Sequence, residues 1–281
     1  MRRREFLPAL AVSTAAAQSQ TPVSPSGRLK QCVTRGVFGR GLSLEDTCRA
    51  AARAGAKGYD LIGPNDWPML KKYGLIPTMY PPGPGGNISD GINRKESHDA
   101  LEKRMHAAID ESAANSIPNI IALSGTRKGM PDSEGADHSV AFLNRVKAHA
   151  EDKGVTICIE YLNSKVDHQD YMFDHIGWGV DVVKRVNSAR VKILFDIYHA
   201  QIMDGDIVGN IRDNFQWIGH FHTGGNPGRH EIDDTQELNY RFIARSIADL
   251  GYAGYIAHEY SPAPGRVAIA SLNQAIEIFS V

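Results

Sequence analysis

Residues 192–196 read KILFD, an apolar run that ends on a carboxylate, and other runs in the second half of the chain share this form. Each is rich in strand-forming residues and ends on a side chain that can bind a metal ion. The four terminal residues are Glu160, Asp196, His222 and Glu259. Successive runs lie about one βα unit apart, which is the spacing that a helical crossover between parallel strands requires. The pattern favours a parallel sheet with helical connections.

The same alternation extends through the rest of the chain. We predict strands at 30–37, 58–62, 76–79, 119–123, 155–160, 191–196, 217–222 and 255–259. Apolar stripes at helical spacing predict helices at 44–54, 99–115, 140–153, 179–186, 240–250 and 267–279. The length of 281 residues also allows two small domains. Eight strands that alternate with helices instead predict an α/β fold with one (β/α)8 TIM barrel over residues 28–281.

Residues 1–27 are expected to be a signal peptide and linker outside the barrel. Three arginines precede the apolar run 8–17, which ends in a cleavage-like Ala15-Ala16-Ala17. The stretch RREFL at 3–7 resembles a twin-arginine export signal. The apolar run is shorter than the roughly 20 residues of a membrane-spanning helix, so we expect no stable membrane anchor. We therefore expect export to the periplasm, with a cytoplasmic protein carrying a basic tail as the alternative.

The composition excludes some classes of protein. The chain has 31 Lys and Arg against 32 Asp and Glu, a formal net charge of -1. A protein that binds nucleic acid mainly through its phosphates is expected to be more basic, so we predict no nucleic-acid partner. Cys32, Cys48 and Cys158 are scattered without a CxxC motif, which indicates neither a disulfide framework nor a structural zinc site.

The four strand-terminal residues predict a metal site. In a parallel barrel the C-terminal ends of the strands meet at one mouth, where barrel enzymes have their active sites. One carboxylate at a strand end is more often a helix cap, but three at one mouth would repel each other unless a cation neutralised them. Three carboxylates and an imidazole suit Mn²⁺ or Mg²⁺, and Co²⁺ or Zn²⁺ stay open.

The motifs around these residues resemble those of the hydroxypyruvate isomerases. These enzymes belong to the xylose isomerase-like barrels, as do the ketose 3-epimerases. The motifs are FDIYHAQ at 195–201, IGH at 218–220, PGRHE at 227–231 and HEY at 258–260. The resemblance implies a metal-dependent isomerase acting on a small hydroxy-keto acid or sugar. It also implies that Glu160 and Glu259 move the proton, and that Asp196 and His222 complete the metal site.

The chemistry of the reaction explains why such residues are needed. Removal of a proton next to a carbonyl leaves an enediolate, and a metal ion that binds both oxygens stabilises its charge. Two carboxylates can then divide the work, one removing the proton and the other returning it. We expect Glu160 and Glu259 to have these roles as well as to bind the metal, with the direction in which each acts as the base left open.

Further residues are expected near the substrate or beneath the site. His199 and Asp167 match or fall near substrate-contacting positions of the family. Arg229, in the glycine-rich loop 224–229, is expected to bind a substrate carboxylate or hydroxyl pair, with a surface salt bridge as the alternative. His220 is expected to pack below the metal and His258 to face the helices, because side chains alternate along a strand. For Asp60 we expect a capping or structural role.

One position leaves the substrate open. The better-known hydroxypyruvate isomerases have Gln where this chain has His222, whereas the ketose 3-epimerases have His. An epimerase or isomerase of a larger carbohydrate is therefore the alternative, and the predicted export favours it. An apurinic-site endonuclease would need more His ligands and a basic face. A non-catalytic sugar-binding barrel is the remote alternative, and a homo-oligomer stays open.

Overall fold

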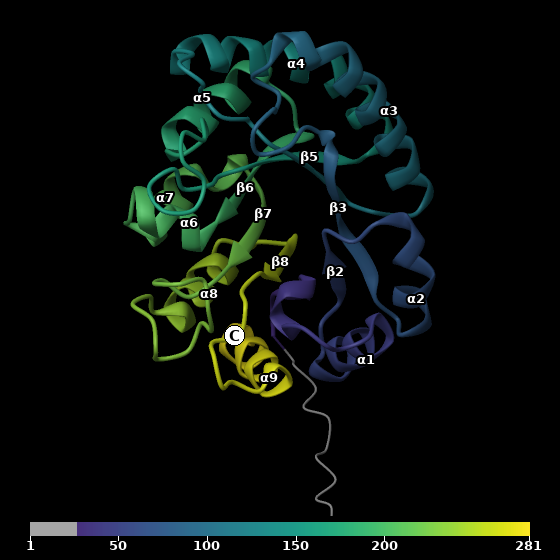
Figure 1. Cartoon of the computed structure of the whole chain (residues 1–281), viewed down its shortest axis with the longest axis vertical. Coiled ribbons are helices and arrows are strands. Elements are labelled where there is room, and N and C mark those ends of the chain that lie inside the picture. The colour runs from purple at the N-terminus through teal and green to yellow at the C-terminus, as the bar shows by residue number, and fades with distance from the viewer. Residues whose placement is uncertain (1–26) are drawn as a thin grey trace, which may run out of the picture.

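The structure is a computed structural model that describes residues 27–281. The predicted signal peptide and linker lie outside the described residues, apart from Gly27. Within the described part, eight parallel strands form a closed barrel in chain order, and β8 pairs with β1. Helices surround this barrel (Figure 1). The predicted (β/α)8 barrel is confirmed.

The strands agree closely with the predicted positions. They are β1 (Lys30–Val33), β2 (Gly58–Asp60), β3 (Ile76–Gly85), β4 (Asn119–Ala122), β5 (Thr156–Glu160), β6 (Val191–Asp196), β7 (Ile218–Thr223) and β8 (Tyr255–His258). β1 is shorter than predicted because residues 35–38 form a 3-10 turn, η1 (Arg35–Phe38). β3 is longer than predicted, and its register with β4 shifts between Tyr80 and Gly85.

The helices show where apolar periodicity is informative. They are α1 (Leu44–Ala54), α2 (Trp67–Lys72), α3 (His98–Ala114), α4 (Asp132–Lys153), α5 (Ile176–Val186), α6 (Ile197–Met203), α7 (Ile207–Asn214), α8 (Tyr240–Asp249) and α9 (Ala268–Phe279). The short 3-10 turns η2 (Pro64–Asp66), η3 (Lys95–Ser97) and η4 (Phe215–Trp217) lie in the connections. α2, α6 and α7 were not predicted, because each is too short to show a stripe. α4 begins earlier than predicted. Its first turns are mostly polar, so they show no apolar stripe that would have marked the start of the helix.

Side chains alternate between the barrel interior and the layer under the helices. In β6 and β7, Phe195 and Phe221 lie in the apolar outer layer, with ring centroids 6.1 Å apart. Their neighbours Asp196 and His222 are fully buried and point into the barrel. All three cysteines are buried and free, as expected. None of the described helices is long and apolar enough to cross a membrane.

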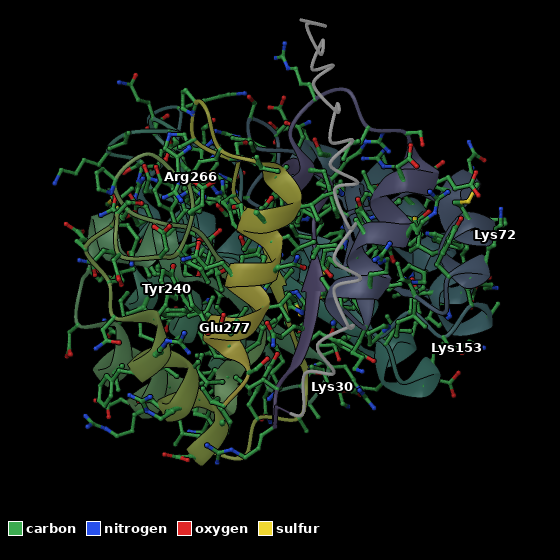
Figure 2. All side chains as sticks on the ribbon, turned by 90° about the horizontal axis from the view of Figure 1, so that it is seen from below. Lys30, Lys72, Lys153, Tyr240, Arg266 and Glu277 are labelled. Carbon is green, nitrogen blue, oxygen red and sulfur yellow. The ribbon has the colours of Figure 1, made fainter. Side chains whose placement is uncertain are left out.

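The outer surface of the helices is charged. Figure 2 shows Lys72, Lys153 and Glu277 on the outside of the molecule, and each of these side chains is at least 40% exposed. The two ends of the described chain meet beside the start of β1, where the Arg28 N–H donates to the Val281 carbonyl at 2.9 Å.

The segment after β3 depends on one glycine. The Ile92 and Asn93 N–H groups donate to the Leu123 and Ser124 carbonyls, so this segment lies directly against the chain that follows β4. A Cβ on Gly91 would collide with the backbone of Leu123 and Gly125, which cannot move as a flexible side chain can.

We expect Gly91→Ala to lower the free energy of unfolding by about 1–3 kcal/mol, the usual cost of overpacking. Gly63→Ala is the matched control, because its Cβ would meet nothing within 4 Å. Urea denaturation measures both variants. Equal stability of the two would contradict this account of the close approach.

Candidate active site

Four predicted residues converge at the C-terminal mouth of the barrel. Glu160 and Asp196 end β5 and β6, His222 lies in β7, and Glu259 directly follows β8. One ligand atom from each lies within 4.8 Å of those from the others. Glu160, Asp196 and His222 are buried, and the Glu259 side chain is 23% exposed. The geometry therefore brings together all four residues of the predicted metal set.

His222 lies at the centre of this group. Its Nδ1 atom is 2.6 Å from Glu259 Oε2, 3.3 Å from Glu160 Oε1 and 4.0 Å from Asp196 Oδ2. None of these oxygens has hydrogen-bonding geometry toward Nδ1, so this buried nitrogen has no hydrogen-bond partner among the described residues. One nitrogen and three carboxylates around one point are a donor set that fits a divalent cation.

The carboxylates differ in their pKa values because their surroundings differ. Burial, together with the charge of Glu259, raises the pKa of Glu160. Burial also raises the pKa of Asp196 to about 6, although Arg229 and His222 oppose the shift. Burial alone would raise the pKa of Glu259, but the charges of Arg229 and His222 lower it to about 2. Glu160 and Glu259 are thus shifted in opposite directions, as in many acid–base pairs.

Arg229 reaches into the site from the loop after β7. Its Nη2 donates to Asp196 Oδ2 at 2.7 Å and to Glu259 Oε2 at 2.8 Å, and its Nε donates to the Glu259 carbonyl at 3.2 Å. The guanidinium also lies over the Tyr198 ring, 5.4 Å from its centroid. Its ion pairs therefore lie inside the mouth rather than on the outer surface.

The other two predicted substrate residues lie near each other, and His199 also contacts Asp196. His199, in the first turn of α6, is fully buried, and its backbone N–H donates to Asp196 Oδ1 at 3.2 Å. Burial lowers the pKa of His199 well below its usual value. Asp167 lies in the loop after β5, where its Oδ2 accepts from Tyr198 OH at 2.9 Å. Its Oδ2 is 4.0 Å from His199 Nδ1.

Asp60, for which the sequence predicted only a capping or structural role, supports the site from below. It ends β2 inside the barrel, and its Oδ2 lies 2.6 Å from His220 Nε2 and 3.1 Å from His222 Nε2. Thr78 Oγ1 donates to the other carboxylate oxygen. Burial alone would raise the pKa of Asp60, but the two histidines hold it well below its usual value. When His222 is neutral, Asp60 keeps its proton on Nε2 and leaves the Nδ1 lone pair for a cation.

The two remaining strand histidines lie where side-chain alternation placed them. His220 is fully buried below His222, with ring centroids 5.3 Å apart. His258 faces the helices, 5.3 Å from the Phe279 ring of α9. Its Nε2 pairs with Gln31 Oε1 at 2.9 Å. Asp60 ends β2 as Glu160 and Asp196 end their strands, but the predicted strand ran on to residue 62, so this position was not recognised.

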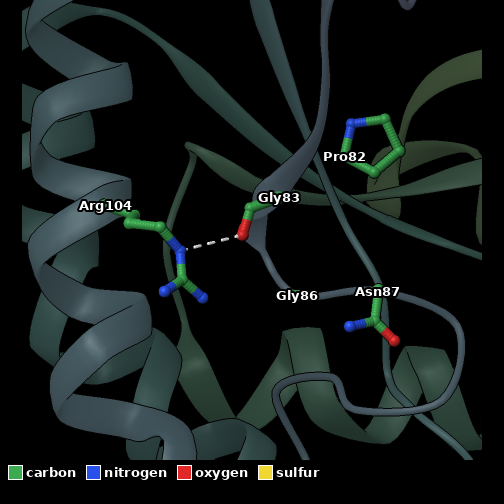
Figure 3. Close-up of a pocket in the computed structure, with 5 residues that line it drawn as sticks. All are labelled: Pro82, Gly83, Gly86, Asn87 and Arg104. Atoms are coloured by element: carbon green, nitrogen blue, oxygen red, sulfur yellow. Dashed lines mark hydrogen bonds between the residues drawn. The ribbon is translucent and has the colours of Figure 1, made fainter.

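A pocket elsewhere is not part of this site. A cavity of about 290 Å³ is lined by β3, the segment after it and α3, through Pro82, Gly83, Gly86, Asn87 and Arg104 (Figure 3). The Nε of Arg104 donates to the Gly83 carbonyl at 3.2 Å, and none of the mouth carboxylates lines the cavity.

The chain resembles known proteins along most of its length. Residues 48–275 match the family model described as a xylose isomerase-like TIM barrel. The chain is 28% identical to the 2-oxo-tetronate isomerase of Pectobacterium atrosepticum, over 77% of this chain and 86% of that protein. It is 32% identical to a putative hydroxypyruvate isomerase of Homo sapiens, over 67% of this chain and 70% of that protein.

One further relative matches part of the chain in sequence, and one solved structure matches its fold. A D-psicose 3-epimerase of Ruminiclostridium cellulolyticum is 34% identical over 44% of this chain and 40% of its own length. A crystal structure titled AP endonuclease, family 2, from Brucella melitensis superposes with a TM-score of 0.76 and 25% identity, over 85% of this chain and 95% of that chain.

We expect Asp60→Ala to destabilise the protein by about 1–3 kcal/mol, because it leaves the buried Nε2 atoms of His220 and His222 without their acceptor. Asp60→Asn keeps the volume and one acceptor oxygen, so its loss should be smaller. Asp249→Ala, on an exposed surface pair with Arg28, is the control and should change stability by less than about 0.5 kcal/mol. Urea denaturation measures the stability of all three variants. If Asp60→Ala changed stability as little as Asp249→Ala does, Asp60 would not support the site.

Proposed function

The chain belongs to the xylose isomerase-like TIM barrel family, and we propose that it is a metal-dependent isomerase of a small hydroxy-keto acid or sugar. Relatives named as isomerases and epimerases make it an enzyme of that kind. The reaction we propose moves a proton through an enediolate. The observation that carries the proposal is the convergence of Glu160 and Glu259 on His222 Nδ1, at 3.3 Å and 2.6 Å.

The residues of the mouth have distinct tasks in this reaction. A divalent cation held by Glu160, Asp196, His222 and Glu259, which suit Mn²⁺ or Mg²⁺, would supply Lewis-acid stabilisation of negative charge on substrate oxygens. Glu160 and Glu259 approach the same point from β5 and β8, on strands that are not neighbours in the barrel. One carboxylate would remove the proton from the substrate carbon and end protonated, and the other, in its protonated form, would donate a proton to the neighbouring carbon and end ionised. The substrate hydroxyl proton would move to the former carbonyl oxygen, and exchange with solvent would restore both carboxylates.

Arg229 favours an acidic substrate. Its guanidinium is planar, always charged and already placed between Asp196 and Glu259, so a substrate carboxylate at the mouth can share its donors. The relatives named 2-oxo-tetronate isomerase and hydroxypyruvate isomerase carry the names of hydroxy-keto acids. Both observations support a hydroxy-keto acid as the substrate class.

A ketose 3-epimerase is the second candidate. The histidine at position 222 favours it. The ketose 3-epimerases have His at the corresponding position, whereas the better-known hydroxypyruvate isomerases have Gln. The partial similarity to a D-psicose 3-epimerase also favours this candidate. A nuclease is not favoured, since a net charge of -1 gives little attraction for DNA.

A substrate panel separates the two candidates. Purified protein with Mn²⁺ is incubated in deuterated water with three- and four-carbon hydroxy-keto acids and, separately, with free ketoses. We expect deuterium to enter the hydroxy-keto acids, measured by NMR and mass spectrometry. Exchange confined to C3 of ketoses would instead establish the epimerase, and metal binding without exchange into any compound would favour a non-catalytic barrel.

Glu160→Gln and Glu259→Gln should each lower turnover by about 10²–10⁴-fold, the usual contribution of a general acid or base. Each variant should still bind Mn²⁺, measured by titration calorimetry after removal of metal with a chelator. Glu277→Gln on α9 is the control, because its exposed carboxylate lies away from the mouth and pairs with Arg241. Variants that bind metal and keep full turnover would overturn the assignment.

A further inference from the structure

Asn163 has an amide orientation that its hydrogen bonds define. It is fully buried, three residues after Glu160. Its Oδ1 accepts from the backbone N–H groups of Val166 and Asp167, both at 2.9 Å. An amide oxygen can accept these bonds, whereas an amide NH₂ cannot. The Nδ2 group must therefore point the other way, where it donates to Asp167 Oδ2 and lies against His199 Nδ1, each at 2.6 Å.

This orientation determines the tautomer of His199. Because an NH₂ group only donates, His199 Nδ1 must accept, and so it carries no proton. A proton on Nδ1 would set one N–H against another. The ring proton of His199 is therefore on Nε2, and Asn163 is the residue that keeps it there.

The Nε2 nitrogen has no hydrogen-bond partner among the described residues. It is buried and lies 3.8 Å from Asp196 Oδ2, beyond hydrogen-bonding distance. A buried donor left unpaired is destabilising, so such a group is usually paired by a water or a ligand. His199 follows Asp196 in the first turn of α6, which places this N–H beside the candidate metal residues.

We propose that Asn163 is a positioning residue that selects the Nε2–H tautomer of His199, so that this N–H donates to a substrate oxygen beside Asp196. The proposal rests on the proposed function, because it assumes that the substrate binds at this mouth. It also specifies a substrate feature: the oxygen beside Asp196 must accept a hydrogen bond, as a carbonyl, hydroxyl or enediolate oxygen does. A cationic ammonium group at that position would meet a donor and be rejected.

Asp167 receives a different role from the one the sequence suggested. Its Oδ2 accepts from Asn163 Nδ2 and from Tyr198 OH at 2.9 Å. Tyr198 lies under the Arg229 guanidinium. Asp167 therefore holds Asn163 and Tyr198 in place, and a contact with substrate is not needed to explain its position.

An exchange of the two side chains tests the proposal. In Asn163→Asp with Asp167→Asn, one amide and one carboxylate still face each other, and Asp at 163 still accepts from the backbone N–H groups. An ionised Asp at 163 can only accept, however, so the proton of a neutral His199 must move to Nδ1. We expect kcat to fall by about 10²-fold, as when one oxyanion donor is lost, with KM changed by less than about threefold.

Two controls separate this effect from a structural one. In a His199→Phe background there is no ring nitrogen for residue 163 to orient, so the exchange should cost little further activity. Asn214→Asp, at the end of α7, makes the same chemical change away from the mouth and should leave turnover unchanged.

The tautomer itself is measured in the wild-type protein, so the test does not depend on how the variants fold. Long-range ¹H–¹⁵N NMR of ¹⁵N-histidine-labelled protein with diamagnetic Mg²⁺ should show an unprotonated Nδ1 and a protonated Nε2 for His199. A protonated Nδ1 would overturn the proposal, and so would a tautomer change in the exchange variant with kcat unaltered. If no panel compound turned over, the proposed function would fail, while the NMR result would still decide the role of Asn163.

Discussion

Repulsion among three carboxylates is the constraint that organises the mouth of this barrel. Glu160, Asp196 and Glu259 are brought within a few ångström because their strands end together. Burial weakens the screening that water would provide, so each charge must be met by a proton or a cation nearby. His222 and Arg229 supply part of that charge from within the chain. The arrangement is stable only because cationic groups reach the same point, and this requirement makes the mouth suited to a divalent ion.

The sequence predicted the parts of this arrangement that depend on periodicity. All eight strands were found because buried strands of a parallel barrel are short apolar runs at regular spacing. The four mouth residues followed, since each ends such a run. α6 is short, and it was also missed because Asp196 both ends β6 and caps the helix, with its side chain accepting from the His199 N–H, so no loop marks the boundary.

The supporting residues were harder to predict for a physical reason. Asp60 acts through contacts with His220 and His222, which lie about 160 positions further along the chain. Asn163 acts through the geometry of its amide, and neither a strand pattern nor a ligand count encodes that orientation. Contacts between distant segments depend on the closed barrel, so they became visible only once the side chains were placed. Asp60 and Asn163 thus contact His222 and His199 at the mouth through hydrogen bonds that no sequence motif marks.

The pairing of β8 with β1 also has a consequence for the order of the chain. Arg28 and Val281 are hydrogen-bonded to each other at the end of the barrel opposite the mouth, so a short peptide could join them. Every βα unit would then be joined to the next by a peptide connection. The chain could be cut between another pair of units without moving a mouth residue. A circular permutant of residues 28–281 should therefore retain the mouth, because its geometry depends on the closure of the sheet and not on which unit is made first.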